Sequence, residues 1–305
     1  MLKLGDLSAR QLTSRLADDG LYLETGRFVT RIQSSIPSVA HGLGLLYGDY
    51  PLQQAAQFAD FHLRLARPAN GRRWFRPQVV LFQDGNSRFR PLPLAQAFPM
   101  FEWGLNWCIS SRAHDYLMLH AAVVEKDGRA AILPAPPGSG KSTLCAALVH
   151  NGWRLLSDEL TLVRPQDGHV LPLPRPISLK NGSIALMRDF LSDPVFSPAV
   201  IDTHKGTVAH LKAPTDSVLR HAETALPAWI IFPRYEAGAD AVLTAVGKAS
   251  AHVRVAKNAF NYSLLGGRGF DTLADLIDRC DSHEFRYSRL DDALATFERL
   301  RPGQP

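Results

Sequence analysis

The first 112 residues alternate apolar and polar positions in short runs, a pattern that is typical of half-buried strands. Four such runs cover residues 21–24, 27–32, 61–65 and 78–82. Helical spacing of apolar residues predicts a short helix over 7–16, capped by Ser8 or Asp6, and a core-facing helix over 94–111. We therefore expect a small N-terminal α/β domain over residues 1–112.

Longer apolar strands and helical segments follow from residue 113 onward. The predicted strands cover residues 116–124, 129–133, 153–156, 160–163 and 229–233. Helices are predicted over 183–190, 251–265, 271–280 and 291–300, the last with Asp291 at its cap position. Strands that alternate with helices favour an α/β fold. We expect this second domain to span residues 113–305.

One stretch of the second domain, residues 129–152, reads RAAILPAPPGSGKSTLCAALVHNG. An apolar strand enters a Pro/Gly loop that closes on Gly-Lys-Ser-Thr before a helix, which is the order of a P-loop nucleotide-binding site. The backbone N–H groups at such a helix start form an anion cradle. We expect the cradle to consist of Gly138, Ser139, Gly140, Lys141, Ser142 and Thr143. Lys141 would reach the β- and γ-phosphates of a nucleotide, and the Ser142 hydroxyl would ligate Mg²⁺.

The loop departs from the usual pattern at its first position, where Ala135 replaces glycine. Ala135 precedes a proline, so it is biased towards extended geometry and has less need of a positive φ. Pro136 and Pro137 lack an N–H group, and the first half of the loop therefore cannot donate to phosphate. An ordinary Pro/Gly turn before a helix is the alternative, but the flanking strand and helix favour the nucleotide site.

Two acids, Asp158 and Glu159, follow the next predicted strand. Ligands of open α/β sheets bind at the carboxyl ends of strands, so we expect both acids to face the Gly-rich loop. Phosphoryl transfer uses a metal that bridges the phosphates and an acid that takes the proton of the acceptor hydroxyl. One of these acids can hold Mg²⁺ while the other acts as the base. The alternative is that either acid only caps a turn.

Composition and charge limit the other classes of function. With 46% hydrophobic and 21% charged residues, the 305-residue chain is typical of globular proteins with a sizeable core. A net charge of +5 without a dense Lys/Arg face does not indicate nucleic-acid binding. Three widely spaced cysteines argue against disulfides, and no apolar run is long enough for a membrane span. We expect a cytoplasmic protein without nucleic-acid or membrane partners.

Residues 72–76, Arg-Arg-Trp-Phe-Arg, interleave basic and aromatic side chains after the turn signal Asn70-Gly71. Such a stretch can form a stacking surface for bases. We favour the other interpretation, the end of a strand with a solvated basic edge.

Several motifs together resemble a known family. His120 precedes the motif PPGSGKST, and LLSDELTLV follows it. This order resembles the C-terminal catalytic domain of HPr kinase/phosphorylase, and more closely the bacterial HPr-kinase-related kinases. LPRPISLK, THKGTVAHL and IIFPRY, beginning at Leu173, Thr203 and Ile230, look like later blocks of that group. The resemblance covers roughly residues 116–300 and implies a P-loop kinase domain of the HPr kinase/phosphoenolpyruvate carboxykinase-like type, behind a small N-terminal α/β domain.

The resemblance also implies roles for single residues. Lys141 and Ser142 would bind ATP and Mg²⁺, and Asp158 would be the proton acceptor and donor. Glu159 stands where the HPr enzyme has a second Asp, and it would help to hold the metal. His120 would lie beside the transferred phosphate; taken alone, it would instead be a core or strand-end histidine.

Other parts of the family pattern are less direct. Arg175, Lys180 and Lys205 are candidates to neutralise charge on the transferring phosphoryl group, and a surface role is the alternative for each. The acceptor-recognition stretch of the HPr enzyme is replaced by Pro-rich residues 171–176, which puts HPr in doubt as the substrate. The reverse reaction with inorganic phosphate stays open. The HPr enzyme is a hexamer, which makes a homo-oligomer one expectation for this chain.

The leading hypothesis is an ATP-dependent kinase that phosphorylates a hydroxyl, on a serine of a peptide or protein or on a small metabolite. The alternative is an ATPase or a nucleotide-switched binding protein of a peptide-modification system. A long apolar Walker-B strand or an arginine finger would favour that alternative, and neither is evident. A degenerate domain that binds no nucleotide is disfavoured because the loop glycines, Lys141, Ser142 and Asp158 are all present.

Overall fold

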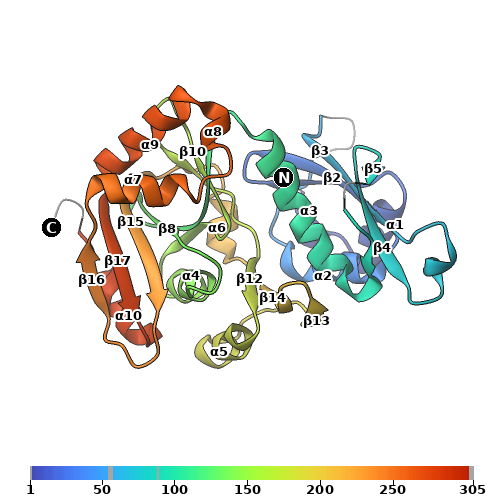
Figure 1. Ribbon diagram of the computed structural model, residues 1–305. Coiled ribbons are helices and arrows are strands. Elements are labelled where there is room, and N and C mark those ends of the chain that lie inside the picture. The colour runs from blue at the N-terminus through green and yellow to red at the C-terminus, as the bar shows by residue number, and fades with distance from the viewer. Residues whose placement is uncertain (1, 54–57, 88, 302–305) are drawn as a thin grey trace. The chain divides into compact units, whose positions relative to one another are not determined.

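The computed structural model describes residues 2–53, 58–87 and 89–301 (Figure 1). Within these residues it is a mixed α/β protein with three sheets, and the chain divides into two compact units. The first contains Met1–Arg112, Ser178–Ala185 and Asp193–Leu219, and the second contains Ala113–Ile177, Leu186–Ser192 and Arg220–Pro305. These units differ from the expected domains, 1–112 and 113–305, because two later segments join the first unit.

The first unit is built on a sheet with the strand order β1-β2-β3-β4-β5, to which β6 adds by pairing with β4. The strands are β1 (Leu21–Thr25), β2 (Phe28–Ser34), β3 (Phe61–Ala66), β4 (Gln78–Gln83), β5 (Asn86–Ser87) and β6 (Leu92–Pro93). β2 and β3 are parallel, whereas β1–β2 and β3–β4 are antiparallel. Alternate residues of β3 are buried and exposed, so the polar–apolar alternation of the sequence follows the two faces of the sheet.

Helices pack on this first sheet and against one another. They are α1 (Ala9–Ala17), α2 (Pro37–Leu46) and α3 (Ala97–Arg112), with short 3₁₀ turns η1 (Leu4–Asp6), η2 (Gly71–Arg73) and η3 (Leu94–Gln96). Of the two expected caps of α1, Ser8 is the N-cap: its hydroxyl accepts from the N–H of Gln11 at 3.3 Å, and the Gln11 side chain accepts from the N–H of Ser8 at 2.9 Å. This reciprocal pair is a capping box.

A second, three-stranded sheet has the order β12-β14-β13. Its strands and the helices around it are β12 (Ile177–Lys180), α5 (Gly182–Phe190), β13 (Val200–Thr203), β14 (Gly206–Leu211) and α6 (Thr215–Leu219). Apart from Ile177, the strands of this sheet belong to the first unit. The motif that begins at Thr203 therefore forms the turn and second strand of a hairpin.

The second unit contains the large sheet, with the strand order β11-β10-β7-β8-β15-β17-β16 and with β9 also paired to β7. Its strands are β7 (Leu117–Lys126), β8 (Arg129–Pro134), β9 (Arg154–Ser157), β10 (Leu160–Val163), β11 (Val170–Leu171), β15 (Leu226–Tyr235), β16 (Val242–Ala245) and β17 (Asp281–Tyr287). β8, β15 and β17 are mutually parallel, and the strands beyond them on both sides are antiparallel to their neighbours.

Helices cover both faces of the large sheet (Figure 1). They are α4 (Lys141–Val149), α7 (Lys248–Ala256), α8 (Tyr262–Leu265), α9 (Gly267–Arg279) and α10 (Leu290–Glu298). α7 and α9 share one core with β7, β8 and β15, and α4 packs on β7 and against α10. None of the helices in the described ranges has the length and apolar character needed to cross a membrane.

Three local expectations were wrong. The segment 251–265 is not one helix, because α7 ends at Ala256 and residues 258–260 pair with β7 before α8 begins. Asp291 does not cap α10; it lies in the first turn, after the N-cap Arg289. Residues 72–76 are not a strand end, since η2 covers Gly71–Arg73 and the rings of Trp74 and Phe75 are exposed.

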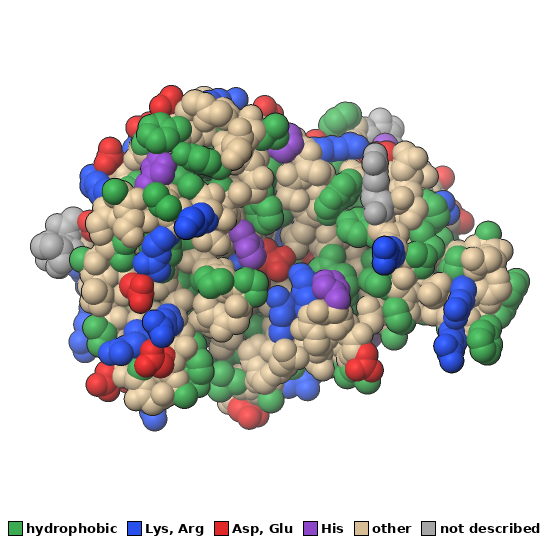
Figure 2. Space-filling view, viewed as in Figure 1, with side chains coloured by type: hydrophobic (Ala, Val, Ile, Leu, Met, Phe, Trp, Pro, Cys, Tyr) green, Lys and Arg blue, Asp and Glu red, His purple; other side chains and the backbone are tan. Residues whose placement is uncertain are grey.

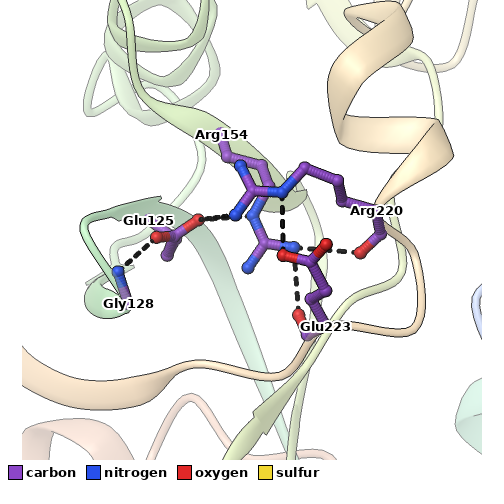
Figure 3. Close-up of polar contacts among 5 residues, drawn as sticks. All are labelled: Glu125, Gly128, Arg154, Arg220 and Glu223. Carbon is purple, nitrogen blue, oxygen red and sulfur yellow. Dashed lines mark hydrogen bonds and ion pairs between the residues drawn. The ribbon is translucent and has the colours of Figure 1, made fainter.

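A buried ion pair joins β7 to β9 (Figure 3). Glu125 lies opposite Arg154 in the ladder, and its carboxylate accepts a hydrogen bond from Nε of Arg154. The same carboxylate accepts from the N–H of Gly128 at 2.6 Å. Nη1 of Arg154 donates to the carbonyl oxygens of Arg220 and Glu223, both at 3.0 Å. Both charges are therefore paired and hydrogen-bonded, as burial requires.

Replacing Glu125 with Gln would leave the Arg154 guanidinium buried without a carboxylate. We expect this variant to lose about 3–5 kcal/mol in the free energy of unfolding, measured by urea denaturation. The matched control is Glu223→Gln, which makes the same change at an exposed ion pair with Arg220 and should lose at most about 1 kcal/mol. Equal losses in the two variants would contradict the role assigned to the buried pair.

Candidate active site

The two halves of strand β7 pair with different segments of the chain. On one side, β8 pairs with residues 121–126, and the backbone of residues 258–260 takes its place beside residues 117–120. On the other side, β9 pairs with residues 123–125 and β10 with residues 117–120. β8 and β9 therefore both stop pairing with β7 near its middle, one on each side. The expected site residues lie at these two points.

The Gly-rich loop, residues 135–140, leaves the sheet on the β8 side. β8 ends at Pro134 opposite Ala121, and α4 begins at Lys141 with Gly140 as its N-cap. Gly138 and Gly140 have left-handed backbones, with φ of +87° and +86°. Residues with a Cβ disfavour this conformation, which explains why glycine stands at both positions.

Two tyrosines from neighbouring strands hold the loop. The backbone N–H of Tyr235, at the end of β15, donates to the carbonyl oxygen of Ser139 at 3.0 Å. The hydroxyl of Tyr287, at the end of β17, donates to the carbonyl oxygen of Gly140 at 3.2 Å. Burial raises the pKa of the Tyr287 hydroxyl, so this group stays protonated and able to donate. The carbonyl oxygens of Ser139 and Gly140 are thus hydrogen-bonded to residues of β15 and β17.

Lys141 is a buried cation in the first turn of α4. Its Nζ atom has no hydrogen-bond partner among the described residues, and neither has the buried hydroxyl oxygen of Ser139 in the loop. Buried polar atoms are normally paired, and a buried charge without a partner is costly. An anionic ligand at the start of the helix would satisfy both atoms.

Asp158 and Glu159 form a corner between β9 and β10, on the other side of β7. Ser157 lies opposite Val123 and Leu160 lies opposite His120, so the two acids fall beside the stretch of β7 between these residues. The Ser157 hydroxyl accepts a hydrogen bond from the N–H of Leu160 at 3.0 Å and closes the corner. Asp158 is buried and Glu159 is half-buried.

The loop and the acidic corner therefore flank the same point of β7. Pro134 lies opposite Ala121 on one side of β7, and Leu160 lies opposite the adjacent His120 on the other side. Neighbouring strands are about 4.8 Å apart, so Pro134 and Leu160 are separated by two strand spacings, roughly 10 Å. The charges of Asp158 and Lys141 both affect the pKa of the Cys145 thiol in α4. Burial raises its pKa, the Asp158 carboxylate raises it further, and Lys141 lowers it. The acid and the lysine thus lie near one buried atom.

His120 directly precedes Ala121, the residue of β7 at which the pairing with β8 ends. Its backbone N–H donates to the carbonyl oxygen of Asn258 at 2.6 Å, and its ring centroid is 5.7 Å from that of Phe260. The residue is half-buried and lies opposite Leu160, the first residue after the acidic corner. The histidine, the Gly-rich loop and both acids thus lie around the middle of β7.

The three further candidate cations are divided between the two units of the chain. Arg175 is buried in the second unit, which also holds the loop. Lys180 and Lys205 belong to the first unit. There, burial together with the charges of Lys205 and Lys180 lowers the pKa of His204, and Nζ of Lys205 lies 5.4 Å from the ring centroid of Trp103.

Residues that could hold a metal are few. Within the described ranges, no group of three or more His, Cys, Asp or Glu side chains could enclose an ion. The Ser142 hydroxyl, in the first turn of α4, and the Glu159 carboxylate are both half-buried. They are hard oxygen donors, and Mg²⁺ is commonly held by one or two such groups together with water and substrate phosphates. The donor set fits Mg²⁺ on a nucleotide.

Sequence reasoning missed the aromatic residues around the loop. Tyr235 and Tyr287 touch it only because β15 and β17 run parallel to β8, a long-range arrangement that no local motif encodes. β17 itself was not predicted, since its sequence DSHEFRY is mostly polar. The alternating buried pair Phe285 and Tyr287 was the one available signal.

Comparisons with known proteins add limited information. Residues 100–184 match a family model described as "SynChlorMet cassette protein ScmC". A search of curated proteins found no match. Among solved structures, the Hpr(Ser) kinase/phosphatase from Coxiella burnetii aligns with 60% of this chain and 95% of its own, at 12% identity and a TM-score of 0.27. The family match covers less than a third of the chain and the structural overlap is low, so neither assigns a family.

Gly138→Ala and Gly140→Ala together distinguish the cost of backbone strain from the cost of a steric clash. Either substitution forces a left-handed alanine, which costs about 1–2 kcal/mol. A Cβ on Gly138 meets open space, whereas one on Gly140 comes 2.6 Å from Oη of Tyr287 and 3.1 Å from Cβ of Tyr235. We expect Gly140→Ala to unfold at least about 1 kcal/mol more easily than Gly138→Ala in urea.

The clash is tested by combining Gly140→Ala with Tyr287→Phe. Removal of the hydroxyl should make Gly140→Ala less destabilising than it is in the wild-type background, in a double-mutant cycle. Equal losses for the two glycine variants, or an additive cycle, would contradict the close packing of Tyr287 on the loop.

Proposed function

We propose that the protein is an ATP-dependent kinase that transfers the γ-phosphate of ATP to a hydroxyl group. The observation that carries the proposal is the buried Nζ of Lys141, which has no hydrogen-bond partner among the described residues and stands at the start of a helix behind two left-handed glycines. A polyphosphate is the ligand that suits a lysine and a helix start together.

Nucleotide binding is assigned to the second half of the loop. Pro136 and Pro137 have no N–H, so the donors are the backbone groups from Gly138 to Thr143. The helix dipole of α4 and the Lys141 ammonium add positive charge at the same place. Because the carbonyl oxygens of Ser139 and Gly140 are bonded to tyrosines, the loop is held before any ligand arrives.

Magnesium is assigned to Ser142 and Glu159, whose oxygens fit its preference for hard ligands. When bound, Mg²⁺ would offset the negative charge of the phosphates. Lys141 holds charge that develops on the phosphates, and His120 lies beside them at the middle of β7. Cations and N–H groups that are already in place at the reacting centre lower the barrier most.

Asp158 is assigned as the base. Its carboxylate takes the proton of the acceptor hydroxyl while the acceptor oxygen bonds to the γ-phosphorus. The bond from that phosphorus to the bridging oxygen breaks, and ADP leaves with the electron pair. Asp158 is buried, so water is largely excluded from the proton transfer.

Two substitutions separate binding from chemistry. Asp158→Asn should lower transfer of radioactive γ-phosphate from ATP to acceptors in a host lysate by about 10²–10⁴-fold while the protein still binds ATP. Lys141→Ala should weaken ATP binding by at least about tenfold, measured by calorimetry, because a charge-assisted contact is lost.

The matched control is Asp275→Asn, which makes the same chemical change on the exposed side of α9 and should alter neither measurement. Full transfer by Asp158→Asn would contradict the base assignment. Radioactivity released only as free phosphate by the wild type would contradict the kinase proposal and favour an ATPase.

A further inference from the structure

Four large apolar side chains face solvent next to the proposed site. This apolar shelf consists of Val253 of α7, Phe260 between α7 and α8, Leu264 of α8 and Phe270 of α9. Each side chain is 50–67% exposed. Figure 2 shows hydrophobic side chains around a histidine in the area where Figure 1 draws these helices. Exposed apolar groups that gather on one surface commonly mark a binding site.

Contacts between the three helices make the shelf one surface. The His252 ring, next to Val253, lies 5.1 Å from the ring of Phe270. Its Nε2 atom is 3.2 Å from the hydroxyl oxygen of Tyr262, at the start of α8. α7, α8 and α9 therefore meet at His252.

The shelf reaches the proposed site through Phe260. The N–H of Phe260 donates to the carbonyl oxygen of Met118 at 2.8 Å, and the N–H of His120 donates to Asn258 at 2.6 Å. These two bonds dock the segment on β7 like a short strand, and they fix the Phe260 ring 5.7 Å from that of His120. The apolar surface thus begins at the residue assigned to the transferred phosphate.

The fold does not need these side chains for its core. The inward-facing residues of the same helices, Ala251 and Val255 of α7 and Leu273 and Leu276 of α9, are almost completely buried in the core of the large sheet. Folding therefore leaves the shelf residues with much of their apolar area in water. Burying that area against a ligand would be favourable.

The size of the shelf limits the kind of ligand that can bind there. Four partly exposed side chains supply a few hundred Å² at most, whereas a stable interface between two copies of a chain needs about 800 Å² from each. A peptide of three or four residues in an extended conformation spans about 10–13 Å. That length carries apolar side chains from His120 across neighbouring helices, whose axes are about 8–10 Å apart. A small polar metabolite would leave the shelf uncovered.

We propose that the apolar shelf binds apolar side chains that flank the acceptor serine of a peptide substrate. The inference rests on the kinase function proposed above and narrows its acceptor from any hydroxyl compound to a peptide. Phe260 receives the side chain nearest the serine, and Leu264 and Phe270 receive those farther along the peptide.

The test uses two synthetic peptides of equal length and charge with one central serine. One carries Leu and Phe on both sides of the serine, and the other carries Gly and Thr at those positions. Fluorescently labelled peptides are titrated with full-length Asp158→Asn protein, and phosphate transfer from ATP is followed with the wild type. The variants Leu264→Ser and Phe270→Ser alter the shelf, and Val242→Ser, on edge strand β16, is the control.

The apolar peptide should bind at least about tenfold more tightly than the polar one. Leu264→Ser and Phe270→Ser should each raise its Kd and KM by about tenfold while kcat stays within about twofold, and Val242→Ser should change nothing. Equal binding of the two peptides, or unchanged Kd in both shelf variants, would overturn the proposal whether or not ATP transfer occurs. Shelf-dependent binding without any transfer would uphold the peptide site and count against the kinase function alone.

Discussion

The buried pair of Glu125 and Arg154 fixes the start of β9 opposite Glu125 of β7, and the acidic corner follows four residues after Arg154. A slip of one residue would move every side chain of β9 to the opposite face of the sheet. It would also separate two charges that are buried together, at a cost of several kcal/mol. The ion pair lies at one end of β7 and the candidate site at its middle. An interaction without chemistry of its own therefore determines where Asp158 and Glu159 stand.

The same strand explains why the Gly-rich loop and the acids are close together. β7 can pair with only one strand on each side at any point, so the chain must leave wherever its partner changes. Both changes occur around Ala121, where β8 gives way to residues 258–260 on one side and β9 to β10 on the other. The segments that leave β7 at these points carry polar residues and glycines, which are common where a strand ends. The site is thus a consequence of how the strands are paired.

The local parts of this arrangement were predictable from the sequence. Apolar runs marked β7 to β10, and the spacing of Gly138, Gly140 and Lys141 marked the loop, because these signals lie within a few residues of one another. Contacts between distant segments were not predictable: the docking of residues 258–260 on β7, the tyrosines under the loop, and the return of Ser178–Ala185 and Asp193–Leu219 to the first unit. Each depends on tertiary packing, which local propensity does not encode. The roles of the site residues stay predictions.

The most direct measurement of the central claim follows the γ-phosphate itself. Wild-type protein would be incubated with host lysate, Mg²⁺ and ATP whose γ-phosphate carries heavy oxygen, and the products analysed by mass spectrometry. Our account predicts a new phosphate ester of a hydroxyl group that contains the heavy oxygens, formed together with ADP. Heavy inorganic phosphate as the sole labelled product, with no ester in the protein, peptide or small-molecule fractions, would contradict it.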